Sequence, residues 1–390
     1  MASEVSAKKL GSLTPRERFL HAVDRTEDRD DLASLDLGYG IASYTRGAHD
    51  RLCDYLGIDC GNVEVSSRML NIVYPSREIA DCLSGDLRVI APAGPLNGMG
   101  DVELDDRSYR DEWDLVRRIS AGGLYYDFIG APLAACRTLE ECLARLRRPT
   151  GASERAQGMF DRAAAHRAEG YAVGAWCFAG IFEMLFWLRG YKLAYLDFAQ
   201  RPNLVEGLMD ALLAIQIEFW TAILQETKGL LDVVLLTEDL GTQTGLMISP
   251  AQFRAIVKPR FRELIRAIRN AAPDVRILLH SDGAVAPLVG DLIEIGVDIL
   301  NPIQPGASGM DPAWLKAEFG EDLSFHGGLD IQGLLVQGTP TDVRREVERL
   351  FDVFGTSGGY VMAPAHCIQP DVPPENIQAL VDSVLGLRAR

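Results

Sequence analysis

The chain has 390 residues, 47% apolar and 24% charged, which is typical of a soluble globular protein with one large domain or two. Its formal net charge of −16 at pH 7 argues against nucleic acids and anionic membranes as partners, because both bind basic patches. No apolar run approaches the roughly 18 residues that span a membrane.

The cysteines and the first residues indicate a cytoplasmic protein. Seven cysteines are present, an odd number, and no two have the C-x-x-C spacing, so we expect no disulfide framework and a reducing compartment. Residues 1–13 are small and polar and lack the apolar region of a signal peptide. We expect these first residues to be disordered.

The first part of the chain contains two predicted strands and a long irregular stretch. The strands are at residues 32–37 and 85–91. Residues 92–130 are rich in glycine, aspartate and aromatic residues without a clear period, and we interpret them as an excursion over one face, with a hairpin near residues 124–126. Helices are predicted at residues 14–24, where Thr14, Pro15 and Glu17 form a capping signal, and at 49–56, 139–146 and 153–168.

From residue 171 on, strands and helices alternate regularly. Ser249 is a helix cap, and Pro259 should kink or interrupt the helix that follows it. Strands are predicted at residues 171–177, 231–236, 276–280, 297–300, 323–325 and 360–363, and helices at 181–188, 204–227, 249–270, 284–295, 312–319, 341–354 and 375–387.

Eight short apolar strands, each followed by a helix, predict a parallel sheet that closes into a single (β/α)8 TIM barrel over residues 14–390. An open, doubly wound α/β sheet is the alternative. The phosphate-binding glycine motifs of nucleotide-binding folds are absent from the sequence.

Three of the six histidines follow predicted strands, at the end of the barrel where such proteins build their sites. His280 and Asp282 are two residues apart, so on an extended chain both side chains point the same way and can bind a metal or move a proton. His326 and His366 follow strands seven and eight. A histidine bonded to its neighbouring carboxylate in a structural turn is the alternative. The remaining histidines are predicted on helices at the surface: His21, His49 and His166.

Carboxylates and a thiol follow other strands and are further candidates. Glu238 and Asp239 are adjacent at the end of strand four, so only one of them should face the site; helix capping or pairing with arginine is the alternative. Asp330 follows two glycines and has the same two interpretations. Cys367 is either a metal ligand or a small buried residue.

Candidate substrate-binding residues are expected beside this cluster. Arg88 is the obvious cationic candidate near strand two, and Trp176 begins an aromatic group that forms either a wall of the site or part of the core. Tyr39 and Gln304 follow strands one and six.

Residues 366–377 (HCIQPDVPPENI) resemble the closing motif of the uroporphyrinogen decarboxylase superfamily. Residues 326–330 (HGGLD) resemble its Gly-Asn-Leu-Asp segment, and residues 14–23 and 85–88 resemble the first segments of its other branches. The resemblance extends over about residues 14–388 and implies a single (β/α)8 barrel, with a homodimer as the favoured assembly.

This superfamily contains two chemistries. Its decarboxylases need no cofactor and use amino-terminal arginines and an aspartate after strand two, and the sequence departs from both patterns, since Ala91 and Pro92 stand where the aspartate is expected. Its corrinoid-linked methyltransferases bind zinc through a His-x-Cys pair on strand five and a Cys near strand eight. At those positions this chain has His280 with Asp282, and His366 with Cys367 beside it.

The resemblance therefore implies a methyltransferase that moves a methyl group between a small methylated substrate and a corrinoid on a partner protein. His280, Asp282 and His366 would hold zinc, Cys367 or Glu238 would complete the shell, and Glu238 or Asp239 would supply a proton. A cofactor-free decarboxylase or lyase using His366 and Asp330, and a protein that binds a corrinoid or tetrapyrrole without turnover, are the alternatives.

Overall fold

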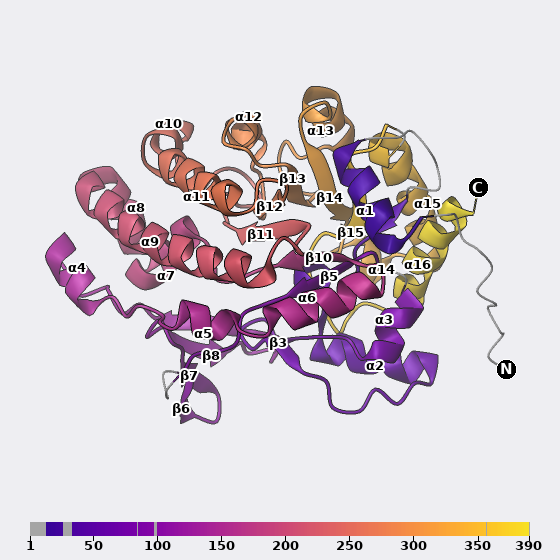
Figure 1. The fold of residues 1–390 in the computed structure, drawn as a ribbon, viewed down its shortest axis with the longest axis horizontal. Coiled ribbons are helices and arrows are strands. Elements are labelled where there is room, and N and C mark those ends of the chain that lie inside the picture. Colours follow the sequence, from indigo (N-terminus) through magenta and orange to yellow (C-terminus); the bar gives the residue numbers. More distant parts are fainter. Residues whose placement is uncertain (1–12, 26–32, 84, 97–99, 356, 390) are drawn as a thin grey trace.

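Eight parallel strands form one sheet, and its two end strands are the first and second of the eight along the chain. The sheet is therefore a nearly closed barrel (Figure 1). The computed structural model describes all residues except 1–12, 26–32, 84, 97–99, 356 and 390. The predicted (β/α)8 barrel is confirmed, and the open-sheet alternative is wrong. The strands of the barrel are β1 (Ser34–Leu35), β5 (Leu87–Ile90), β10 (Ala172–Ala175), β11 (Val233–Thr237), β12 (Arg276–His280), β13 (Ile299–Ile303), β14 (Ser324–Leu329) and β15 (Tyr360–Pro364).

Strands β1 and β5 lie at the two ends of this order, and a carboxylate joins them. The backbone N–H of Asp86 donates to the carbonyl of Leu35 at 2.7 Å, and the N–H of Leu35 donates back to the Asp86 carboxylate at 3.0 Å. The same buried carboxylate accepts hydrogen bonds from Arg18 and Arg388. Asp86 therefore closes the barrel where the strand ladder is missing.

Helices surround the barrel, and most lie where the sequence predicts them. The capping box of Thr14 and Glu17 is confirmed. The predicted helix at 153–168 is broken in two: the first piece ends at Ala156, and Gly158, with φ of +80°, precedes the second. The helices are α1 (Pro15–Asp24), α2 (Arg46–Leu56), α3 (Arg77–Leu83), α4 (Leu139–Arg145), α5 (Ala152–Ala156), α6 (Met159–Ala168), α7 (Ile181–Arg189), α8 (Tyr191–Gln200), α9 (Pro202–Thr227), α10 (Pro250–Gln252), α11 (Lys258–Ala271), α12 (Val289–Glu294), α13 (Pro312–Phe319), α14 (Leu334–Gln337), α15 (Pro340–Leu350) and α16 (Pro374–Arg388).

The expected effect of Pro259 is visible in the backbone. Between α10 and α11, residues Phe253–Val257 form a π-helical segment, and Pro259 lies in the first turn of α11. Proline cannot donate the hydrogen bond that would continue a regular helix through this point, so the helix changes its winding there.

The irregular stretch at 92–130 is more ordered than the sequence indicates. Its last two strands form the predicted hairpin near residues 124–126, but they belong to a four-stranded antiparallel sheet that projects from one edge of the molecule (Figure 1). A short three-stranded sheet lies elsewhere. The strands are β6 (Val102–Asp105), β7 (Ser108–Arg110), β8 (Val116–Ile119) and β9 (Tyr126–Gly130), and β2 (Tyr44–Thr45), β3 (Val65–Ser67) and β4 (Ile72–Val73).

Helix α9 corrects the prediction that no apolar run is long enough to span a membrane. It has 26 residues, and by length and hydropathy it passes the test for a membrane-spanning helix. Of its most apolar window, 61% is buried inside the protein, against helices α5, α7 and α11. It therefore has the character of a core helix, whose apolar residues cover the barrel.

Two further expectations fail at α2. Cys53 and Cys60 form a disulfide, which the odd cysteine count and the spacing do not indicate. His49 lies on a helix as predicted but is fully buried rather than at the surface. The other expected surface histidines, His21 and His166, are partly exposed.

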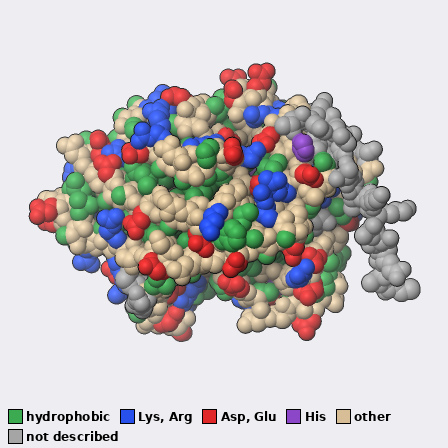
Figure 2. All heavy atoms as spheres, viewed as in Figure 1, with side chains coloured by type: hydrophobic (Ala, Val, Ile, Leu, Met, Phe, Trp, Pro, Cys, Tyr) green, Lys and Arg blue, Asp and Glu red, His purple; other side chains and the backbone are tan. Residues whose placement is uncertain are grey.

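Acidic and basic side chains are interspersed over the face seen in Figure 2, with apolar side chains between them. The negative net charge of the sequence is thus not gathered into one patch on this face. The expected disorder of residues 1–13 concerns residues that lie, except for the last, outside the described part of the chain.

Candidate metal site at the barrel mouth

His280, Asp282 and His366 come together at the carboxyl ends of strands β12 and β15. Each offers one ligand atom, and these atoms all lie within 4.8 Å of one another. The rings of His280 and His366 are 5.6 Å apart between centroids, at an interplanar angle of 61°. Two imidazoles and a carboxylate are a donor set that suits zinc and leaves a fourth position open, as in catalytic zinc sites.

A chain of buried side chains fixes which nitrogen of His280 faces this site. Nδ1 of His280 donates to Oδ1 of Asn301 at 2.7 Å, and Nδ2 of Asn301 donates to Nδ1 of His326 at 2.6 Å. Nε2 of His326 then donates to Asp36 at 2.9 Å. Because Nδ1 of His280 carries the proton, its Nε2 keeps a free lone pair for a metal.

The same series of hydrogen bonds determines the role of His326. The residue is predicted to be catalytic, but its ring is 2% exposed, and both nitrogens are occupied by Asn301 and Asp36. His326 therefore supports His280 through Asn301. The sequence gives no signal for Asn301 beyond its position after a strand.

Asp282 is held by a neighbouring strand end. Nε2 of Gln304 donates to Oδ1 of Asp282 at 2.9 Å, and Oε1 of Gln304 accepts from the N–H of Gly283 at 2.8 Å. Gln304, predicted to bind substrate, thus orients a candidate ligand. Oδ1 of Asp282 lies 3.8 Å from Nε2 of His280.

Of the adjacent carboxylates, Asp239 is the one that faces the site. Its Oδ1 lies 3.9 Å from Nε2 of His280 and accepts from the N–H of Asp282 at 3.1 Å. Burial, the largest influence, raises the pKa of Asp239 above its ordinary value. The prediction that only one of the two would face the site agrees with this geometry.

Glu238 has a different position from the one its predicted role requires. Its carboxylate accepts the N–H groups of Ile181, Phe182 and Glu183 at 2.6, 3.0 and 3.1 Å, so it caps the amino terminus of α7. Burial raises the pKa of Glu238 to about 8, against the opposing effect of these three donors. The structure favours the capping alternative over a catalytic or ligand role.

Glu183 is a further candidate, which the pattern of strand ends does not reveal. It lies in the first turn of α7, and burial together with the charges of Asp239, Glu238 and Asp282 raises its pKa well above the ordinary value. A carboxyl group that remains protonated can donate a proton. Glu183 does not follow a strand directly, so a search of strand ends passes over it.

His366 and Cys367 interact with each other. Nδ1 of His366 lies 3.0 Å from the sulfur of Cys367 and 2.8 Å from the backbone nitrogen of that residue. In the tautomer whose Nδ1–H donates to the sulfur, Nε2 keeps the lone pair that binds a metal. Burial lowers the pKa of His366, but Cys367, Asp282 and Asp239 outweigh it and raise this pKa to about 10. Cys367 is buried and lies beside the three-residue group rather than in it.

Asp330 is engaged in a turn. Its two oxygens accept the N–H groups of Gln332, Gly333 and Leu334 at 2.9, 3.0 and 3.1 Å. These bonds order the start of α14, so the structure favours the structural interpretation over an acid–base role. The expected tight backbone is present, since Gly327 and Gly328 both have positive φ.

The expected substrate-binding residues separate into two groups. Arg88 is 3% exposed and lies between Leu87 and Val89, which face the barrel interior, so its own side chain points outward. Its guanidinium lies over the rings of Tyr39 and Tyr171, at 4.7 and 3.7 Å from their centroids. Arg88 thus points away from the barrel interior, whereas Tyr39 packs against the interior cluster.

Trp176 remains at the mouth. It follows β10 directly, is partly exposed and packs against the interior cluster of the barrel. A hollow of about 520 Å³ lies elsewhere, between α8 and the segment that leads into α10. None of the three metal-type residues lines that hollow.

The comparisons with known proteins agree with this architecture. A family model described as uroporphyrinogen decarboxylase (URO-D) matches residues 169–386, more than half of the chain. The chain belongs to this family. The URO-D resemblance expected from the closing motif is thus confirmed.

Individual relatives match over shorter stretches. The uroporphyrinogen decarboxylase of Chlorobium limicola is 27% identical over 146 residues, which is 37% of this chain and 40% of that protein. One from Thermus thermophilus is 31% identical over 144 residues, 36% and 39% of the two chains. The chain spans about two fifths to half of the length of these and other URO-D relatives that it matches.

A solved structure matches over nearly the whole chain. The methyltransferase from Methanosarcina mazei superposes with a TM-score of 0.64 at 16% identity, covering 96% of this chain and 98% of that one. At this identity the likeness concerns the fold. The two chains share this fold over nearly their whole length.

Proposed function

We propose that this URO-D family member is a metal-assisted methyltransferase, which moves a methyl group between a small methylated substrate and a corrinoid held by a partner protein. The group of His280, Asp282 and His366 carries this proposal, because its donor atoms lie within 4.8 Å at the barrel mouth. A zinc ion there would act as a Lewis acid on the oxygen or sulfur that leaves the methyl group.

The residues of the chain supply the remaining parts. Asn301 keeps the proton on Nδ1 of His280, and Gln304 orients Asp282, so both imidazole and carboxylate are set before substrate arrives. Glu183, whose pKa is raised by burial and by the neighbouring carboxylates, is the candidate donor of a proton to the leaving group. Trp176 is the candidate wall against the substrate.

The sequence relatives named uroporphyrinogen decarboxylase make a cofactor-free carboxy-lyase the second candidate. Such an enzyme must neutralise the carboxylates of its substrate with cationic side chains. Arg88, the strand-end arginine proposed for that role, is buried, and its guanidinium lies over the rings of Tyr39 and Tyr171. This placement favours the methyltransferase proposal.

The deciding experiment is elemental analysis of the purified protein and of His280→Ala, with His166→Ala as a matched histidine control on α6. We expect about one zinc per chain at the barrel mouth, lost in His280→Ala and retained in His166→Ala. Zinc at the second site proposed below is excluded by keeping the protein oxidised. Methyl transfer is then followed by the absorbance change of a corrinoid protein with a panel of methylated donors.

A protein that carries no metal and is still active would rule this proposal out. In that case decarboxylation of small carboxylic acids is the assay to run. We further propose, from the family resemblance, that residues 14–390 act as one domain in a cytoplasmic homodimer, which sedimentation analysis can check.

A further inference from the structure

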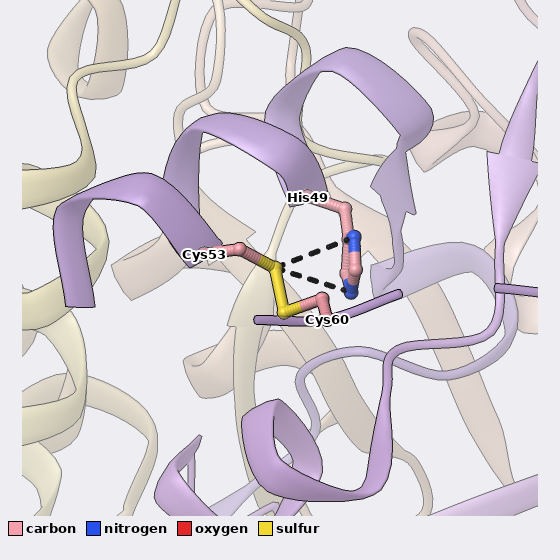
Figure 3. Close-up of side chains that lie close together, drawn as sticks. All are labelled: His49, Cys53 and Cys60. Atoms are coloured by element: carbon pink, nitrogen blue, oxygen red, sulfur yellow. Dashed lines mark hydrogen bonds between the residues drawn. A yellow bond between two sulfur atoms is a disulfide. The ribbon is translucent and has the colours of Figure 1, made fainter. Parts of the chain in front are cut away.

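A second group of metal-type side chains lies on α2 and the loop after it (Figure 3). His49 and Cys53 are four residues apart on this helix, so they share one face. Gly57, with φ of +68°, ends the helix and reverses the chain, which brings Cys60 back to the same face. The three ligand-type atoms lie within 4.8 Å of one another.

We propose that this group is a redox-controlled zinc site, in which His49, Cys53 and Cys60 bind the ion when the disulfide is reduced. A dithiol reductant delivers two electrons and two protons to the two sulfurs and is itself oxidised to a disulfide. Zinc then displaces the two protons, because the thiolate is the ligand. The disulfide and the metal site exclude each other.

The distances fit a tetrahedral ion with little movement of the histidine. Nε2 of His49 lies 3.8 Å from the sulfur of Cys53. A nitrogen at about 2.0 Å and a sulfur at about 2.3 Å from a tetrahedral zinc are about 3.5 Å apart. The two sulfurs are bonded to each other in the disulfide and must separate to act as two ligands, a step that reduction allows.

The surroundings of His49 match those of a metal-bound imidazole. Its Nδ1 faces the carboxylate of Asp50 at 3.4 Å, and its Nε2 accepts a long hydrogen bond, 3.3 Å, from the N–H of Ser76. Metal-binding histidines commonly donate their second N–H to a carboxylate. Zinc on Nε2 would replace the long bond and keep the Asp50 contact.

Two residues of this group are shielded from solvent, and the third can be reached by a reductant. His49 is fully buried and Cys53 is 5% exposed, whereas Cys60 is partly exposed on the loop. A reductant can therefore reach Cys60 first. A histidine that only packs against a disulfide is the structural alternative, and it predicts no metal after reduction.

Cobalt(II) distinguishes the two possibilities, because only a thiolate-bound cobalt gives an intense sulfur-to-metal charge-transfer absorption. The full-length protein is reduced, freed of reductant and titrated with cobalt(II), in parallel with oxidised protein. We expect the absorption in the reduced protein alone, at one equivalent. His280→Ala, which removes the barrel-mouth site, should retain it, so that failure of the proposed function does not affect this result.

Variants locate the ligands. Cys60→Ser and His49→Ala should lose the charge-transfer absorption or weaken it strongly, and Asp50→Asn should lower the cobalt affinity about 10–100-fold. Cys82→Ser, at an exposed free cysteine, is the matched control and should be unchanged. Because His49 is buried and its variant can fail to fold, Cys60→Ser on the loop carries the test, with circular dichroism to confirm its fold.

The absence of the absorption in reduced wild-type protein would overturn the proposal. So would its persistence in Cys60→Ser, or its loss in Cys367→Ser, since Cys367 lies beside His366 at the barrel mouth.

Discussion

The side-chain amide of Asn301 determines which ring nitrogen of His280 carries the proton. The side-chain oxygen of Asn301 accepts a hydrogen bond from Nδ1–H of His280, and its side-chain nitrogen donates one to Nδ1 of His326. With Asp36 as the acceptor of the last hydrogen bond, this orientation of the amide satisfies both contacts. The candidate ligand is therefore oriented by residues on two other strands and by Asp36, which directly follows a third.

Replacing Asn301 with leucine should weaken the barrel-mouth metal site without removing a ligand. We expect the zinc affinity to fall about 10–100-fold, because loss of this contact frees the tautomer and the ring of His280. Competition with a chromophoric chelator measures the affinity. Asn270→Ala, at an exposed position on α11, is the control, and an unchanged affinity in Asn301→Leu would show that the amide has no such role.

Glu183→Gln should separate proton donation from metal binding. The metal content should be unchanged, while kcat for methyl transfer falls about 10²–10⁴-fold, the usual contribution of a general acid. Because the pKa of Glu183 is raised, the wild-type rate should decline as the pH rises through that pKa, when the carboxyl loses its proton. A variant with the same decline and the same kcat would contradict the assignment.

At the scale of the elements, α7 shows how a strand-end carboxylate can serve the fold. Glu238 fills the amino terminus of this helix, where three N–H groups have no partner within the helix. The fit is close, because a Cβ on Gly180 would lie 2.0 Å from Cδ of Glu238 and 2.2 Å from the carbonyl oxygen of Thr237. Only glycine leaves room for both.

Gly180→Ala should therefore destabilise the protein by about 1–3 kcal/mol or more, as overpacking of a buried contact does. Urea unfolding followed by circular dichroism measures the loss. Gly290→Ala, on the exposed side of α12 with no atom near its Cβ position, is the matched control and should be neutral or stabilising by about 0.4–1 kcal/mol. Equal stability of both variants would mean that α7 can shift without cost.

For the whole molecule, closure of the barrel depends on Asp86. Its buried carboxylate binds the backbone of β1, the guanidinium of Arg18 on α1 and that of Arg388 on α16. It thus ties the first helix, the seam between β1 and β5, and the last helix together. Arg388 is 302 residues from Asp86 along the chain.

Asp86→Asn should lower the free energy of unfolding by about 3–5 kcal/mol, since it leaves buried positive charge without its carboxylate. Thermal and urea unfolding measure the change. Asp81→Asn, at an exposed carboxylate on α3, should be nearly neutral because a surface ion pair contributes little. A small effect of Asp86→Asn would assign closure to the apolar core instead.

The sequence by itself determined the eight strands, most helices and the end of the barrel that carries the site. Alternation of apolar strands and amphipathic helices is a local property, and parallel strands in a barrel bring their carboxyl ends to one face. His280, Asp282 and His366 could be named for that reason. The sheet within residues 92–130 could not be predicted, because its short, exposed strands bury little apolar surface and show no alternating apolar pattern.

The tertiary structure alone decided what each strand-end side chain contacts. Glu238 and Asp330 accept backbone N–H groups, Arg88 points away from the mouth, and Glu183 acquires its raised pKa from burial and from carboxylates elsewhere in the chain. The partners of most such groups are distant in the sequence, and burial depends on all elements together. A pattern along the chain places a side chain at a strand end, whereas its hydrogen bonds and its protonation depend on the packed neighbours.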